Sequence, residues 1–153
     1  MVKNTRKTFH TGTVVRTVTI KAPKEKVWRE ISNIAGLPSW VLDVKKTTYL
    51  SKKRKGIGAI RKITFERGNT VEEHVIAWKK GVYFTYVATD GLPLRAYVAT
   101  ISINPKNKNT VQITWQSYMN SNKMSANQFM KFLDDMGSFY QISLKNLKTY
   151  LEK

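Results

Sequence analysis

The stretch that decides the fold is residues 124–153, MSANQFMKFLDDMGSFYQISLKNLKTYLEK. Its apolar side chains recur at gaps of three and four residues, the spacing of one face of an α-helix. That face comprises Phe129, Leu133, Met136, Tyr140, Leu144, Leu147 and Leu151, widened by Phe132, Phe139 and Tyr150. Ser125 and Gln128 fit a capping box, so the helix is predicted to run from Ala126 to Glu152. At about 1.5 Å per residue it would be about 40 Å long, enough to cross a whole domain.

The length and composition describe one globular domain. The chain has 153 residues, of which 41% are hydrophobic and 11% aromatic, and it contains no cysteine. Disulfides, thiolate nucleophiles and cysteine metal sites are therefore excluded. No apolar run approaches the roughly 20 residues of a membrane span, and residues 1–12 lack the apolar core of a signal peptide. A cytoplasmic location is expected.

The charge of the chain is strongly positive and unevenly spread. Lys and Arg number 27 against 10 Asp and Glu, a net charge of +17, most of it in residues 1–80. Such a field attracts nucleic acid or an anionic membrane surface, and it also keeps a protein soluble. The run at 52–55, KKRK, is typical of a solvated cluster in a hairpin turn, with Tyr49 and Phe65 the aromatics near it. Charge leaves open a partner such as RNA, a ribosome or an anionic membrane.

The rest of the chain predicts short strands and two short helices. A basic arm at 1–12 precedes a strand at 14–21, a helix that begins near Pro23, and a helical turn at 37–42. Six further strands follow, at 45–51, 58–66, 70–78, 82–89, 96–103 and 110–119. Consecutive antiparallel strands beside segregated helices indicate an α+β fold. The prediction is a single domain over 13–153, with a curved seven-stranded antiparallel sheet wrapped around the C-terminal helix.

Several short motifs carry a resemblance to a known family. They are Ile20, Lys21, Ala22 and Pro23 before Val27 and Trp28; Leu37, Pro38, Ser39 and Trp40 before Val44; Gly56, Ile57, Gly58 and Arg61; Glu73 and Val75; and residues 110–115. With these motifs, residues 13–152 resemble the START-like, Bet v 1-like (SRPBCC) superfamily with the helix-grip fold, and within it the polyketide cyclase/dehydrase type. Its members include lipid carriers, hormone receptors, cyclases and quinone-binding proteins, so the fold does not fix the function.

The resemblance implies a ligand cavity between the sheet and the long helix, open near the apolar loop 92–94 and the short helices. The expected ligand-binding residues are Trp40, Arg61, Ile63, Phe65, Glu73, Val75, Tyr83, Tyr97, Ala99, Ile101, Trp115, Phe129, Leu133, Met136 and Tyr140. For the apolar members of this set, the alternative is a filled core.

Arg61 and Glu73 are polar residues in phase with apolar strand faces. If the turn at 67–69 sets the pairing of its two strands, Arg61 lies diagonal to Glu73. A buried arginine needs such a partner. The pair would either orient a polar group of a ligand or serve as a structural ion pair. The opposite parity would instead turn Glu72 and His74 inward.

Two other positions stand out from their surroundings. Arg16 shares parity with the apolar residues of its strand, and Gly137 lies in the middle of the long helix. A glycine inside a helix costs about 1 kcal/mol relative to alanine. It indicates close approach of the sheet or a ligand, or simple tolerance.

The sequence does not contain a recognisable catalytic or metal-binding motif. His10 and His74 are the only histidines, and neither has a partner at metal-ligand spacing, so no metal or cofactor is expected. Acid or base chemistry would depend on Glu73, Asp90, His74 or a tyrosine, without a diagnostic spacing among them. The leading hypothesis is therefore binding of a small hydrophobic ligand such as a lipid, isoprenoid or polyketide. The alternatives are a cyclase or dehydratase that uses the same cavity, and a basic accessory protein.

Overall fold

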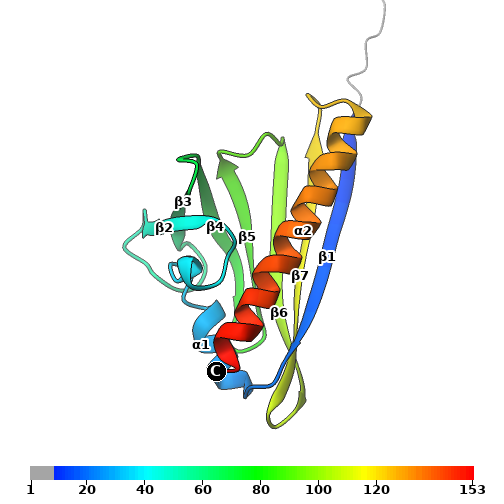
Figure 1. Cartoon of the computed structure of the whole chain (residues 1–153). Helices are drawn as coiled ribbons and strands as arrows, with labels where there is room; N and C mark the ends of the chain where they lie inside the picture. Colours follow the sequence, from blue (N-terminus) through cyan, green and yellow to red (C-terminus); the bar gives the residue numbers. More distant parts are fainter. Residues whose placement is uncertain (1–8) are drawn as a thin grey trace, which may run out of the picture.

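The computed structural model describes residues 9–153, which form a seven-stranded antiparallel sheet that curves around one long helix (Figure 1). The strand order is β1-β7-β6-β5-β4-β3-β2. The elements are β1 (His10–Ile20), α1 (Lys24–Ile31), the 3-10 turn η1 (Leu37–Ser39), β2 (Val44–Tyr49), β3 (Ile60–Phe65), β4 (Thr70–Lys79), β5 (Tyr83–Asp90), β6 (Ala96–Asn107), β7 (Thr110–Ser121) and α2 (Ala126–Leu151). The predicted α+β helix-grip architecture is confirmed.

The long helix α2 begins where its capping residues predict. Ser125 Oγ accepts a hydrogen bond from the Gln128 amide at 3.1 Å, and the Gln128 side chain accepts from the Ser125 amide at 2.9 Å. The helix ends at Leu151, one residue earlier than predicted. This end is fixed to the short helices, because Lys26 Nζ donates to the Leu151 carbonyl at 2.8 Å.

The predicted basic arm is partly wrong. Residues 1–8 of it lie outside the described residues, but His10, Thr11 and Gly12 belong to β1. The reason is pairing with β7, whose strand extends to Ser121 and gives each of these residues a partner.

Helix α2 lies close against β1, because a glycine is present at each of two points of contact. A Cβ atom on Gly12 would lie 2.5 Å from Leu133 Cδ1, and one on Gly137 would overlap the Arg16 guanidinium. The glycine in the helix therefore reflects close approach of a β1 side chain. Figure 1 shows α2 running along β1 and β7, while β3 and β4 lie toward the opposite edge of the curved sheet. This packing leaves a cavity between α2 and the strands near that edge.

The register of β3 on β4 differs from the predicted one by two residues, since Ile63 and not Phe65 lies opposite Val71. Arg61 lies directly opposite Glu73, not diagonal to it. The turn comprises residues 66–68, because the Phe65 amide donates to the Asn69 carbonyl at 2.9 Å. Gly68, with φ of 91°, supplies the left-handed residue that ends such a three-residue loop. The inward parity of Glu73 holds, and Glu72 and His74 lie outward on partly exposed positions.

A β-bulge between β4 and β5 changes which side chains face the core. Val75 pairs with Tyr86, but the next pair is Ala77 with Thr85, so Ile76 is an extra residue in β4. After the bulge Trp78 turns inward and packs against the core. On β5, Phe84 and Tyr86 are the buried residues. The predicted inward position of Tyr83 is therefore wrong, since strand residues alternate between faces.

Candidate functional site

A cavity of about 330 Å³ lies between α2 and the part of the sheet formed by β3, β4 and β5. Most of its lining is apolar, with aromatic rings contributed by the sheet, by the segment after η1 and by α2. The lining residues are Leu37, Trp40, Val41, Arg61, Ile63, Phe65, Asn69, Val71, Glu73, Tyr86, Gly91, Leu92, Pro93, Tyr97, Ile101, Trp115, Phe132, Asp135, Met136 and Phe139.

The mouth of the cavity is marked by its exposed lining residues. Asn69 follows the β3–β4 turn, Gly91 and Pro93 belong to the β5–β6 loop, and Asp135 lies on α2. The opening is thus beside the apolar loop that the resemblance implied. In contrast, Leu37 and Trp40 are buried, so the η1 segment forms a closed inner wall and not part of the opening.

Nine of the residues expected to bind ligand line this cavity. They are Trp40, Arg61, Ile63, Phe65, Glu73, Tyr97, Ile101, Trp115 and Met136. They come from β3, β4, β6, β7, α2 and the residue after η1, so the cavity draws together side chains that are far apart in sequence.

The other six expected residues, Val75, Tyr83, Ala99, Phe129, Leu133 and Tyr140, do not line it. Phe129 stacks on His10 with ring centres 5.9 Å apart, and Leu133 covers Gly12, so both belong to the contact of α2 with β1. Tyr140 is fully buried and stacks on the Trp115 ring at 3.9 Å, behind the cavity wall. Val75 and Ala99 are core residues of the sheet, and the alternation of β5 places Tyr83 outside.

Several lining residues were not expected from sequence. The larger ones are Leu37, Val41, Val71, Tyr86, Phe132, Asp135 and Phe139. The sequence indicated Phe132 and Phe139 only as residues that widen the apolar face of the long helix. Val71 carries a signal, because it has the same parity as Glu73. Tyr86 also carries a signal, because it has the same parity as Phe84 in β5.

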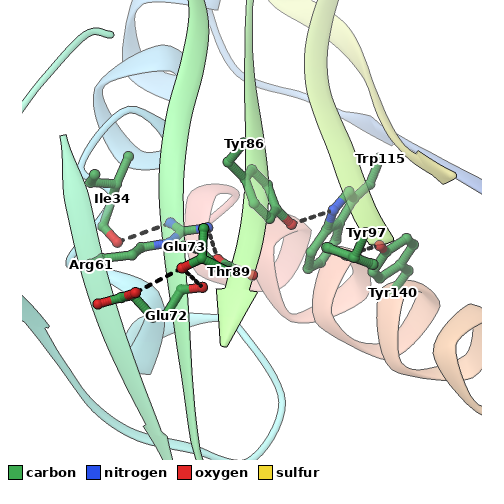
Figure 2. A network of polar contacts seen from close by, with 9 residues as sticks. All are labelled: Ile34, Arg61, Glu72, Glu73, Tyr86, Thr89, Tyr97, Trp115 and Tyr140. Carbon is green, nitrogen blue, oxygen red and sulfur yellow. Dashed lines mark hydrogen bonds and ion pairs between the residues drawn. The ribbon is translucent and has the colours of Figure 1, made fainter. Parts of the chain in front are cut away.

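At the polar end of the cavity lies the Arg61–Glu73 ion pair (Figure 2). Arg61 Nε donates to Glu73 Oε1 at 2.9 Å, and Arg61 Nη2 forms an ion pair with the same oxygen at 2.7 Å. Arg61 Nη1 donates to the Ile34 carbonyl at 3.0 Å, and the guanidinium carbon lies 4.8 Å from the centre of the Tyr86 ring. Only 3% of Arg61 and 6% of Glu73 is exposed. Arg61 is thus neutralised and held by protein groups.

The surroundings of Glu73 change the pKa of its carboxyl. Burial raises the pKa of Glu73 above its ordinary value, and the charge and hydrogen bonds of Arg61 oppose that rise. Both Arg61 bonds end on Oε1, so the lone pairs of Oε2 are not used by Arg61. Glu73 can therefore accept a further hydrogen bond at the cavity, or donate one once it is protonated.

Three tyrosines form the second polar group of the site. Trp115 Nε1 donates to the Tyr86 hydroxyl at 3.0 Å, and the hydroxyls of Tyr97 and Tyr140 are hydrogen-bonded to each other, as Figure 2 shows. Burial raises the pKa of Tyr86 and of Tyr97 well above the usual tyrosine value, and neighbouring acidic groups add to it. The hydroxyls that line the cavity therefore stay neutral.

Metal or histidine chemistry is not supported at this site. His74 points away from the cavity and lies 3.5 Å from Glu72, which also accepts a hydrogen bond from Thr89 at 2.7 Å. Among residues 9–153, no three His, Cys, Asp or Glu side chains are grouped so as to hold a metal ion. The chemistry available in the cavity is that of the Glu73 carboxyl, the Arg61 guanidinium and neutral hydroxyls, with the Asp135 carboxylate at the mouth.

An apolar cavity between a curved antiparallel sheet and a long C-terminal helix is the defining feature of helix-grip proteins. The sequence matches the family described as polyketide cyclase/dehydrase and lipid transport over residues 11–152, and the chain belongs to that family. A comparison with curated proteins finds no matching sequence. Within the described part of the chain, no helix has the length and apolar character needed to cross a membrane.

Solved structures share the fold at low sequence identity. A protein from Bacillus thuringiensis superposes with a TM-score of 0.79 at 19% identity, over 93% of this chain and 100% of that one. XoxI from Bacillus cereus gives 0.79 at 20% identity, over 91% and 94%. The Zhui aromatase/cyclase from Streptomyces sp. R1128 gives 0.77 at 13% identity, over 94% of each chain. At these identities the likeness shows the fold alone.

Proposed function

We propose that this protein binds one small, uncharged, ring-containing molecule in the cavity beneath α2. The observation that carries the proposal is the lining: apolar and aromatic walls around a single ion pair whose two charges already neutralise each other. Burial of apolar ligand surface would supply the affinity, at roughly 25 cal/mol per Å². The few polar groups would fix the orientation of the ligand.

The charges favour an uncharged ligand over a carboxylate. The Arg61 guanidinium is engaged by Glu73 and Ile34, and at the mouth Asp135 is paired with Lys131 at 2.9 Å. A carboxylate ligand would have to separate Arg61 from Glu73 or remain unpaired, and either change is costly in a desolvated site. A hydroxyl, in contrast, can donate to Glu73 Oε2, and a carbonyl can accept from a tyrosine.

The size of the cavity favours a compact ligand. Its volume of about 330 Å³ lies at the low end of the roughly 300–1,000 Å³ found for small-molecule sites. A long acyl chain would extend out of the mouth between Asn69 and Asp135. The rings of Trp40, Phe65 and Phe139 provide surfaces on which a planar ligand can pack.

Family membership supports the same class of ligand. Its description names polyketide cyclases and lipid transport, and one protein of similar fold is an aromatase/cyclase. Aromatic polyketides and quinones are therefore the first ligands to test, and fatty acids are the informative contrast.

The experiment combines native mass spectrometry of the purified protein with thermal shifts at low and high salt. We expect neutral phenolic polyketides or quinones to raise the melting temperature independently of salt, and fatty acids to have a smaller effect. Met136→Trp should fill the cavity and abolish the shift. Met130→Trp is the matched control, because Met130 lies on the same helix but is 60% exposed and does not line the cavity. Equal shifts for both variants would contradict the proposal.

A cyclase that uses the same cavity is the second candidate. The observation in its favour is that burial raises the pKa of Glu73, which gives the cavity a carboxyl able to exchange a proton nearer neutral pH. Incubation with a linear poly-β-ketone tests it. A cyclase would form a product lighter by one water, and Glu73→Gln would lose this turnover. Recovery of the unchanged substrate bound to the protein would favour a carrier.

A further inference from the structure

A second hollow, separate from the ligand cavity, lies between the start of α1 and the β4–β5 turn. Its volume is about 710 Å³, more than twice that of the cavity. The residues that line it are Lys24, Glu25, Trp28, Arg29, Ser32, Lys55, Trp78, Lys80 and Gly81. We refer to it as the basic groove.

The fold brings four cationic side chains to this groove from three separate segments. Lys24 and Arg29 belong to α1, Lys55 to the β2–β3 loop, and Lys80 to the β4–β5 turn. Two of these segments, α1 and the β4–β5 turn, are in close contact, since a Cβ atom on Gly81 would lie 3.9 Å from the Lys24 ammonium. Folding thus assembles a positive site that no single run of the sequence contains.

Little negative charge offsets these cations. Glu25 is the one carboxylate in the lining, and the ion pairs found within residues 9–153 do not include Lys24, Arg29, Lys55 or Lys80. Like charges held around one hollow repel each other, and a bound polyanion would remove that repulsion while releasing counterions.

The floor of the groove is aromatic. The rings of Trp28 and Trp78 meet edge to face at 5.3 Å and 70°. Trp28 is 9% exposed and Trp78 is partly buried, so both indoles rest on the core and show only part of their surface. A low-dielectric floor beneath several cations strengthens their electric field within the groove. Cations combined with aromatic surface are also the features that bind single-stranded nucleic acids.

The lysine-rich run at 52–55 is not itself the site. Lys53 lies over Gly56 and Gly58, and the Arg54 guanidinium lies 4.7 Å from the Tyr49 ring centre. Only Lys55 of the run lines the groove. The positive site therefore depends on tertiary structure, unlike a solvated charge run in a turn.

The position of the groove separates it from the ligand cavity. The groove contacts Trp78 and Lys80 at one end of β4, whereas the cavity mouth lies near Asn69 and Val71 at the other. A ten-residue strand spans about 33 Å, at about 3.3 Å per residue. A flat anionic membrane bound at the groove would therefore lie far from the mouth through which a lipid would pass. A polyanion in solution fits the location better.

We propose that the basic groove binds the phosphodiester backbone of a single-stranded RNA or DNA segment. This function goes beyond the proposed ligand binding and does not depend on it. The contacts are ionic, between backbone phosphates and Lys24, Arg29, Lys55 and Lys80, with a base resting against the Trp28–Trp78 floor.

Fluorescence anisotropy with labelled RNA and DNA oligonucleotides of about ten nucleotides tests the proposal. The groove variant is Lys24→Gln/Arg29→Gln/Lys55→Gln/Lys80→Gln. Its control is Lys106→Gln/Lys108→Gln/Lys123→Gln/Lys145→Gln, which has the same net charge and changes exposed residues outside the groove. We expect the groove variant to lose at least about tenfold in affinity and the slope of log K against log salt to fall by about 3, because each phosphate contact in a single strand contributes about 0.7. The control should change affinity by only about twofold.

Three outcomes would overturn the proposal: equal losses in both variants, no binding at about 50 mM salt, and tighter groove-dependent binding of polyglutamate or of phosphatidylglycerol vesicles than of either oligonucleotide. Lys55→Glu alone, in an exposed loop, repeats the test with minimal risk to folding. Binding of either nucleic acid through the groove supports the proposal, and the preference between RNA and DNA identifies the source of the strand.

Discussion

Arg61 lies directly opposite Glu73 on adjacent strands, and two of its nitrogens contact one oxygen of that carboxylate, Nε at 2.9 Å and Nη2 at 2.7 Å. Both residues are almost completely buried in the wall of an otherwise apolar cavity. Transfer of either charge from water is costly, so each residue is tolerated because of the other. Stability therefore depends on this pair, and under the proposed function the selectivity for an uncharged ligand depends on it too.

Arg61→Met is expected to lower the free energy of unfolding by about 3–5 kcal/mol, because it leaves Glu73 buried without a counter-ion. The double variant Arg61→Met/Glu73→Leu should recover most of this loss, since an apolar pair does not carry a desolvation cost. Urea denaturation at pH 7 measures both. If the double variant were as unstable as the single one, packing and not charge pairing would be the main role of Arg61.

The loss of unfolding free energy caused by Arg61→Met should also depend on pH. Burial raises the pKa of Glu73 in the folded state, and loss of Arg61 removes the group that opposes this rise. A raised pKa means that the folded state holds the proton more tightly. Stability is then highest below the pKa of the unfolded carboxyl, about 4.3, and falls as pH rises through the folded value. The variant should lose less stability at about pH 4 than at pH 7. A pH-independent loss would contradict this assignment.

The buried tyrosines predict a second pH dependence, at the alkaline end. Burial raises the pKa of Tyr86, Tyr97 and Tyr140 above that of a free tyrosine. Unfolded tyrosines ionise near pH 10, so the stabilisation is complete below about pH 10 and is lost above it. Tyrosinate absorbance from these three should therefore appear together with unfolding. Titration of all seven tyrosines while circular dichroism remains native would contradict this prediction.

Gly91 at the cavity mouth should tolerate substitution less well than Gly68. Both have positive φ, 96° and 91°, so alanine at either costs about 1–2 kcal/mol in backbone strain. At Gly91 a Cβ atom would in addition overlap the Thr70 carbonyl oxygen and lie 2.9 Å from Val71 Cα, whereas at Gly68 it meets nothing within 4 Å. Gly91→Ala should thus cost more than Gly68→Ala by denaturant unfolding and weaken ligand binding. Equal costs would mean that the β5–β6 loop moves freely.

Features set by local sequence were predictable, and features set by pairing were not. The span of α2 follows from residue spacing and from Ser125 and Gln128, which act within one turn. The register of β4 on β5 depends on the extra residue Ile76, and the alternating pattern gave no sign of that bulge. The position of Arg61 relative to Glu73 depended on which residue ended a turn.

The rotation of α2 explains most of the remaining error at the site. Its apolar face is broad, and periodicity cannot tell which edge of that face meets β1 and which meets the cavity. Close contacts at Gly12 and Gly137 fix this choice, because they allow Leu133 and Arg16 to approach. As a result Phe132, Met136 and Phe139 line the cavity, while Phe129 and Leu133 do not.

The capping box of α2 offers the last test, because the helix it starts carries three residues of the cavity, Phe132, Asp135 and Met136, within its first turns. Ser125→Ala removes the acceptor of the Gln128 amide and should cost about 1 kcal/mol. Ser138→Ala is the matched control, since Ser138 is exposed in the helix interior, where alanine is the better helix former. Denaturant unfolding should show a loss for the first variant and no loss for the second. Hydrogen exchange at the amides of the first turn should be faster in Ser125→Ala and unchanged in Ser138→Ala. Equal protection of these amides in both variants would mean that packing on β1, and not the cap, holds this end of the helix.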